Sequence, residues 1–165
     1  LSPAVSAGKV ENGLVMRKTY GNFLRVEDFA DITEWETIHI DDLHAMATQE
    51  EYTRDMVGAR FYACEAEGYL KIDKDGVYRF STENDMLWID GKLIVNNNGL
   101  VRRYSRNDGE IALEKGLHRI KVVFISNAEG GWVTGRYNTG EVRLRLASEK
   151  ESRRVKAESL FRKTE

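Results

Sequence analysis

A few residues of this chain have side chains that could take part in acid–base or metal chemistry. Asp41 and Asp42 form an adjacent carboxylate pair, and the histidines are His39, His44 and His118. Glycoside hydrolysis needs two carboxylates that face each other across a cleft, and sequence neighbours rarely do so; Asp41 and Asp42 are better interpreted as residues that begin a helix. No cysteine or carboxylate stands at a metal-ligand spacing from a histidine, so we do not expect the histidines to bind a metal.

The sequence also lacks the short motifs that mark common catalytic sites. It contains no nucleophile elbow, phosphate-binding loop or zinc-binding motif. The formal net charge of −2 gives no reason to expect nucleic acid or an anionic membrane as a partner. No apolar run is long enough to span a membrane. We therefore expect a binding or structural role and not catalysis.

Aromatic side chains offer a different chemistry, because their ring faces can stack on sugar rings. Trp88 lies in an alternating segment and could face either the core or the solvent. Trp132 follows Gly-Gly in an expected loop, which favours exposure. Tyr104 follows two arginines, and it either lines a binding rim or belongs to a solvated edge strand that is protected by charge.

Strands joined by tight turns are expected to position these residues. Asp75-Gly76 and Asp90-Gly91 stand between alternating apolar runs, a pattern that predicts β-hairpin turns. Because no segments of helical period separate the strands, the pattern predicts an all-β sandwich or barrel and disfavours a parallel α/β fold. Short helical turns are expected in the N-terminal third, at 26–29 and within 41–56. Strands are expected at 14–20, 35–40, 60–72, 77–81, 86–95, 109–113, 117–125 and 141–146.

Length and composition suit one folded domain with ordinary solubility. The chain has 165 residues, of which 41% are apolar and 32% charged. We expect a linker over 1–12, the sandwich over 13–147, and a charged tail over 148–165 that docks through Leu160 and Phe161. The first residue is not methionine, so the chain is interpreted as a fragment of a longer protein. Cys64 has no partner for a disulfide and is expected to be a buried small apolar residue.

Sequence motifs in this order resemble the PA-fourteen (protective-antigen fourteen) domain family. They are Gly-Tyr-Leu-Lys-Ile at 68–72, Asp-Gly-Val-Tyr-Arg-Phe at 75–80, Trp-Ile-Asp-Gly-Lys at 88–92, and the strand pair at 111–122 that contains Gly-Leu-His. The resemblance covers residues 13–146 and implies an antiparallel β-sandwich with jelly-roll-like connections. It also implies that His118 is a structural residue at the start of a strand.

A narrower resemblance points to one group of proteins that carry this domain. Asn-Gly-Leu at 12–14, Tyr-Gly-Asn-Phe at 20–23, Val-Glu-Asp-Phe at 26–29 and Ala-Glu-Ser-Leu-Phe at 157–161 are similar to the copies at the C-terminal end of family-twenty glycoside hydrolases. Those enzymes are β-N-acetylhexosaminidases. Members of the wider family are modules of bacterial glycosidases, adhesins and toxins, and many bind carbohydrate, some of them through calcium.

The resemblance also implies where a binding site would lie. In sugar-binding members, a loop before the Ile-Asp-Gly strand carries two adjacent aspartates that hold calcium, an ion that prefers oxygen ligands. The matching stretch here, 81–85, is shorter and lacks the aspartate pair, so three alternatives stay open: a calcium site, a sugar site without metal, or turn residues with no ligand. Glu83 and Asp85 are the calcium candidates. The implied carbohydrate-binding residues are Glu83, Asn84, Asp85, Asn96, Asn97, Asn98, Trp132 and Tyr104.

The resemblance thus implies a non-catalytic carbohydrate-binding or accessory module of an exported bacterial glycoside hydrolase, with a β-N-acetylhexosaminidase as the parent enzyme to which the narrower resemblance points. Its expected location is periplasmic, cell-surface or secreted. The expected partners are a glycan and the catalytic domain of the parent protein, to which the module would be tethered. The alternative is a structural or protein-interaction module that packs on a neighbouring domain and has no sugar site.

Overall fold

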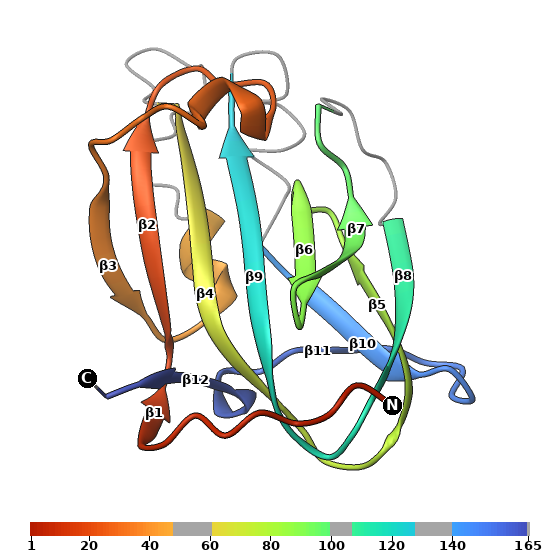
Figure 1. Ribbon diagram of the computed structural model, residues 1–165. Helices are drawn as coiled ribbons and strands as arrows, with labels where there is room; N and C mark the ends of the chain where they lie inside the picture. The colour runs from red at the N-terminus through yellow and green to blue at the C-terminus, as the bar shows by residue number, and fades with distance from the viewer. Residues whose placement is uncertain (48–60, 100–106, 128–139, 165) are drawn as a thin grey trace.

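Two facing β-sheets make up the fold of this protein (Figure 1). The structure is a computed structural model, and it describes residues 1–47, 61–99, 107–127 and 140–164. The strands of the larger sheet are β1 (Val10–Asn12), β2 (Leu14–Tyr20), β3 (Glu36–Ile40), β4 (Tyr62–Ile72), β6 (Met86–Ile89), β7 (Lys92–Asn96), β9 (Gly116–Ser126) and β12 (Leu160–Lys163). Those of the smaller sheet are β5 (Gly76–Thr82), β8 (Asn107–Leu113), β10 (Val142–Leu146) and β11 (Arg153–Arg154). Short 3₁₀ turns are η1 (Val26–Phe29), η2 (Leu43–Ala47) and η5 (Ala157–Ser159).

The strand order confirms the predicted all-β antiparallel sandwich. The 8-stranded sheet runs β1-β12-β4-β9-β6-β7, with β2 paired to β4 and β3 paired to β2. The 4-stranded sheet runs β11-β10-β5-β8, and the strand pairs of both sheets are antiparallel throughout the described residues. The predicted strand at 14–20 and helical turn at 26–29 coincide with β2 and η1. The predicted helical segment 41–56 contains η2, and its remainder from residue 48 lies outside the described residues.

The core lies between the sheets and is built by the alternation of apolar residues along the strands. Leu87 and Ile89 of β6 point into it, as do Phe80 of β5 and Phe124 of β9, and all four side chains are fully buried. Cys64 of β4 is buried in the same cluster, as the sequence predicted. Burying side chains of this size contributes about 1.5–3 kcal/mol each relative to exposure.

A second apolar cluster covers part of the outer face of the 8-stranded sheet. Phe29 of η1 packs there on Val123 and Ile125 of β9. Figure 1 shows η1 crossing the upper ends of β4 and β9. Trp88 of β6 packs against the rim of this cluster and stays half-buried, so its ring lies on the outer face and not in the main core. The sequence had left open whether Trp88 faces inward or outward.

Two of the predicted strand pairings are wrong, although the strands themselves exist. Asp75-Gly76 does not close a hairpin, because β4 belongs to the 8-stranded sheet and β5 to the 4-stranded one. The strands at 111–122 are likewise β8 and β9, which lie in different sheets. The Asp75 carboxylate accepts a hydrogen bond of 2.7 Å from the amide of Lys115, and so ties these two crossing connections together. Turn residues and alternation predict a reversal of the chain, but they do not distinguish a hairpin from a crossing between layers.

The Asp90-Gly91 turn is a hairpin between β6 and β7, as predicted. Both residues have positive φ, 51° and 75°, which is the requirement of a tight type I′ turn. The Asp90 carboxylate receives hydrogen bonds from the Ser2 hydroxyl at 2.8 Å and from the Arg119 amide at 3.1 Å. It also lies 2.7 Å from Nδ1 of His118, whose ring is fully buried. His118 therefore has the structural position that the resemblance implied, and its Nε2 lies 2.7 Å from the carbonyl of Glu114. Asp90 links the turn to the N-terminal segment through Ser2.

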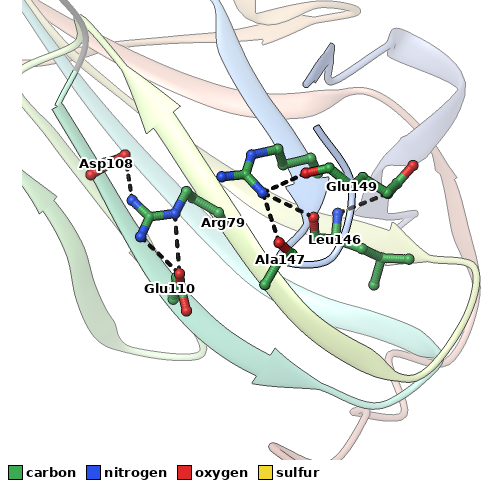
Figure 2. Close-up of polar contacts among 7 residues, drawn as sticks. Arg79, Asp108, Glu110, Leu146, Ala147 and Glu149 are labelled. Carbon is green, nitrogen blue, oxygen red and sulfur yellow. Dashed lines mark hydrogen bonds and ion pairs between the residues drawn. The ribbon is translucent and has the colours of Figure 1, made fainter. Parts of the chain in front are cut away.

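Charged residues cover the outer face of the 4-stranded sheet (Figure 2). Arg79 of β5 contacts two carboxylates of β8, Asp108 at 2.5 Å and Glu110 at 2.8 Å. Hydrogen bonds to these carboxylates raise the pKa of Arg79. Arg145 of β10 donates to the carbonyl of Glu149 at 2.7 Å. Solvated ion pairs of this kind contribute little to stability, so this face is held mainly by its backbone ladder.

The two end segments contact the sandwich. Residues 10–12, which we expected within a linker, form β1 and pair with β12. β12 also pairs with β4, where Leu160 stands opposite Leu70. Leu160 is fully buried and Phe161 is half-buried.

Replacing Leu160 with alanine tests whether the C-terminal tail is part of the folded unit. We expect Leu160→Ala to lower the free energy of unfolding by about 2–5 kcal/mol, because the truncation leaves a cavity in the core. Lys163→Ala, on the exposed end of the same strand, is the control and should change it by less than about 0.5 kcal/mol. Urea denaturation of both variants measures the effect. Equal stability of the two variants would mean that the tail is not docked.

Candidate functional site

The predicted site residues that the structure describes lie at one end of the sandwich, where two loops run together. The β5–β6 connection holds Glu83, Asn84 and Asp85, and the chain after β7 holds Asn97 and Asn98. The amide of Asn97 donates to the carbonyl of Asp85 at 2.8 Å, so the structure brings these two loops into direct contact. We call this pair of loops the loop end.

The side chain of Asn97 holds the two loops together. Its Nδ2 donates to the carbonyl of Asn84 at 2.8 Å and to the carbonyl of Thr82 at 3.2 Å. Its Oδ1 accepts a hydrogen bond from Asn107 at the start of β8. Asn97 is fully buried, and a buried amide is stable only when such partners are present.

Asn84 connects the same loop to the start of β10. Its side chain donates to the carbonyl of Gly140 at 2.9 Å, and its backbone amide donates to the hydroxyl of Thr82 at 3.0 Å. That hydroxyl donates in turn to the carbonyl of Glu141 at 2.8 Å. Asn84 is 0% exposed, so its side chain acts inside the fold in this structure.

Asp85 connects the same loop to β9 by hydrogen bonds. Its Oδ1 accepts a hydrogen bond of 2.8 Å from the amide of Ile125, and its own amide donates to the carbonyl of Val123 at 2.9 Å. The residue is 2% exposed. A calcium ion at Asp85 would therefore compete with a buried hydrogen bond. Within the described residues, no group of three or more His, Cys, Asp or Glu side chains converges as a metal site would require.

Asn98 joins the loop end to η1. Its Oδ1 accepts from the amide of Val26 at 2.9 Å, and its Nδ2 donates to the carboxylate of Glu27 at 2.9 Å. The neighbouring Asp28 accepts backbone amides of Leu24 at 2.8 Å and of Arg25, which lowers the pKa of its carboxyl below the ordinary value. The segment that covers the outer apolar cluster is thus anchored at its η1 turn.

Three of the predicted residues that the structure describes are at least partly exposed, among them Asn98, which η1 engages. Glu83 is half-exposed and Asn96 is exposed, with the Asn96 Oδ1 accepting from the amide of Asn98 at 3.0 Å. Trp132 and Tyr104 lie outside the described residues. The loop end thus offers a carboxylate and an amide on a braced backbone, a combination that can donate to and accept from ligand hydroxyl groups.

Comparison with known proteins identifies the family. A model of the PA14 domain matches residues 11–159. The chain belongs to the PA14 domain family.

Similarity to individual proteins agrees with this assignment. The chain is 37% identical over 150 residues to a beta-hexosaminidase of Porphyromonas gingivalis, and the match covers 90% of the chain but only 19% of that protein. The PA14 domain of the MpAFP antifreeze protein has the same fold, with a TM-score of 0.61 at 15% identity, and 98% of this chain and 96% of that one are covered. The PA14 sugar-binding domain from an RTX adhesin gives 0.57 at 16% identity, with coverage of 92% and 98%. These two structures show the fold alone.

The buried hydrogen bonds made by Asn84, Asp85 and Asn97, which we call the brace, were not predicted from the sequence of this PA14 domain. Amides and acids are common in turns, and their partners here come from distant strands; Asn84 meets Gly140, 56 positions away. The pattern of apolar residues around Thr82 and Ile125 predicts buried strands, but it does not indicate which backbone carbonyls of the loops need a hydrogen-bond donor from a side chain.

Removing the Asn97 amide tests the brace. We expect Asn97→Ala to destabilise the domain by about 2–4 kcal/mol, because two buried carbonyls would lose their donor. Asn96→Ala is the matched control one position away, and as an exposed side chain it should cost about 0.5 kcal/mol or less. Thermal and urea melts of both variants give the comparison. A loss of stability of the same size at both positions would contradict the assignment.

Proposed function

We propose that this PA14 domain is a non-catalytic, glycan-binding accessory module of a glycoside hydrolase related to β-hexosaminidases. The observation that supports the proposal most directly is the 37% identity, over 90% of the chain, to part of a beta-hexosaminidase. The chain spans 19% of the length of that relative, which leaves ample room for a catalytic domain elsewhere in it.

The acidic pair of the sequence supports a role without catalysis. Asp42 begins η2, where its Oδ1 accepts from the amide of His44 at 3.4 Å and its carbonyl accepts from Ala45 at 3.1 Å. This is the helix-start role that its neighbours in sequence predicted. Asp41 is exposed beside it and does not form a facing carboxylate pair with it.

We propose that the loop end contributes to glycan binding through Glu83 and Asn96. Their side chains face solvent on loops whose backbone is fixed by Asn84, Asp85 and Asn97. A braced loop loses little conformational entropy when a ligand binds, which favours weak but specific contacts. Tethering to a catalytic domain then raises the effective concentration of the enzyme at its substrate.

We also propose that the parent protein acts outside the cytoplasm, where polymeric glycans are met. None of the helices in the described residues has the length and apolar character needed to cross a membrane. The domain would then present its loop end to glycan while the rest of the protein carries out hydrolysis.

Titration with oligosaccharides of N-acetylglucosamine tests this function. We expect saturable binding by calorimetry or NMR, and no release of product from a chromogenic N-acetylglucosaminide by the isolated domain. Glu83→Ala and Asn96→Ala should each weaken binding by about threefold to tenfold, since each removes a hydrogen bond to ligand while leaving the melting temperature unchanged. Absence of binding to any glycan on an array, with the domain folded, would favour a purely structural module.

Calcium dependence has its own expected outcome. Because the Asp85 carboxylate is engaged by Ile125, we expect millimolar calcium to leave the melting temperature unchanged and a chelator to leave glycan binding unchanged. Asp85→Asn serves as a comparison, since it keeps the shape and alters the charge. A clear calcium-dependent rise in melting temperature that Asp85→Asn abolishes would contradict this expectation.

A further inference from the structure

A groove lined by residues of β4, β6, β9 and the β6–β7 turn lies on the outer face of the 8-stranded sheet, apart from the loop end. Trp88 forms part of its wall. In the 8-stranded sheet Trp88 stands opposite Lys121 of β9 on one side and opposite Leu93 of β7 on the other, where the pairing with β7 shifts register between Leu87 and Trp88. The groove has a volume of about 410 Å³ and is lined by Glu67, Trp88, Gly91, Arg119, Ile120 and Lys121.

Charged groups of both signs surround the indole ring. The Lys121 ammonium lies 5.1 Å from the ring centroid of Trp88 and 3.7 Å from the carboxylate of Glu67. Arg119 also lines the groove, on the side of the Asp90-Gly91 turn, and it is exposed. The groove therefore combines an apolar ring with one carboxylate acceptor and two cationic donors.

Three other aromatic rings near this face pack against one another. Phe29 packs edge-on against Phe23 at 5.3 Å and against Trp35 at 5.8 Å. Trp35 is also covered by the guanidinium of Arg17, 4.1 Å from its centroid. Trp88 differs, because the group over its ring is a lysine on a flexible four-carbon stem that can swing aside.

The chemistry of the groove suits a sugar more than an apolar protein surface. A pyranose ring has an apolar C–H face that stacks on an aromatic ring, and hydroxyl groups around its edge that need both donors and acceptors. A docked protein domain would favour a broader apolar patch with fewer charges at its centre. The outer face of the 4-stranded sheet differs, because it carries paired charges such as Arg79 with Asp108 (Figure 2).

We propose that the Trp88 groove is a saccharide subsite, in which one pyranose ring stacks on the indole while Glu67 accepts from its hydroxyls and Lys121 and Arg119 donate to them. The inference rests on the proposed glycan-binding function, but it places a contact on the sheet face that is distinct from the loop end. The regular pairing of β6 with β9 across Trp88 holds the ring in position before the ligand arrives.

Titration of the whole chain with the β-1,4-linked trisaccharide of N-acetylglucosamine tests the subsite. We expect the indole N–H resonance of Trp88 to move on binding while that of Trp35 stays in place, the two being assigned from Trp→Phe variants. Trp88→Ala should raise the dissociation constant about tenfold, and Trp88→Phe, which keeps a ring, should raise it less. Leu93→Ala is the control, because Leu93 is exposed beside Trp88 and does not line the groove.

The possible results separate this inference from the proposed function. Binding that is unchanged in Trp88→Ala but weakened in Asn96→Ala would overturn the subsite and leave the glycan-binding function in place. Failure of the wild-type chain to bind any saccharide would overturn both. If Trp88→Ala melts at a lower temperature, the resonance shift in the folded wild-type chain and the affinity of Trp88→Phe decide the outcome, and an unmoved Trp88 resonance counts against the subsite.

Discussion

Buried polar groups at the loop end set the strongest constraint on this PA14 domain. Thr82 is the last paired residue of β5 and Asn84 follows in the loop, and the carbonyls of both accept hydrogen bonds from one side chain, that of Asn97. Leaving such groups without partners in a low-dielectric interior costs far more than an exposed hydrogen bond contributes. The loops can therefore adopt few other arrangements, and the strands that lead into them share that restriction.

The same constraint divides the surface into regions with different tasks. The loop end uses most of its amides and acids internally, so Glu83, Asn96 and the half-buried Asn98 are the described candidates that reach solvent. The face of the 4-stranded sheet carries solvated ion pairs, which contribute little to stability. The face of the 8-stranded sheet is partly covered by η1 and its apolar neighbours, and it leaves the ring of Trp88 accessible at the edge of that cover. A tethered module needs only a few such contacts, because tethering supplies much of the apparent affinity.

Much of the architecture follows from local sequence, and much of the site does not. The pattern of apolar residues predicted β2 with the ends that the structure shows, and Asp90-Gly91 predicted the hairpin between β6 and β7. Both predictions succeeded because they depend only on residues that are adjacent in the sequence. The Asp75-Gly76 turn carries the same local signal but crosses between the sheets, since pairing is decided by how the layers close on each other. The roles of Asn84 and Asp85 depend on Gly140 and Ile125, which approach only after the sandwich has formed. Local sequence thus predicted that polar residues gather at the loop end, but not that several of them would be turned inward.

A crystal structure of the chain grown with the N-acetylglucosamine trisaccharide and millimolar calcium would test the central claim most directly. The account predicts that Asp85 Oδ1 stays within hydrogen-bond distance of the Ile125 amide, close to the present 2.8 Å, and that a pyranose ring lies against Trp88. A structure in which Asp85 has turned outward to hold calcium, with the sugar bound to that ion and Trp88 bare, would contradict it.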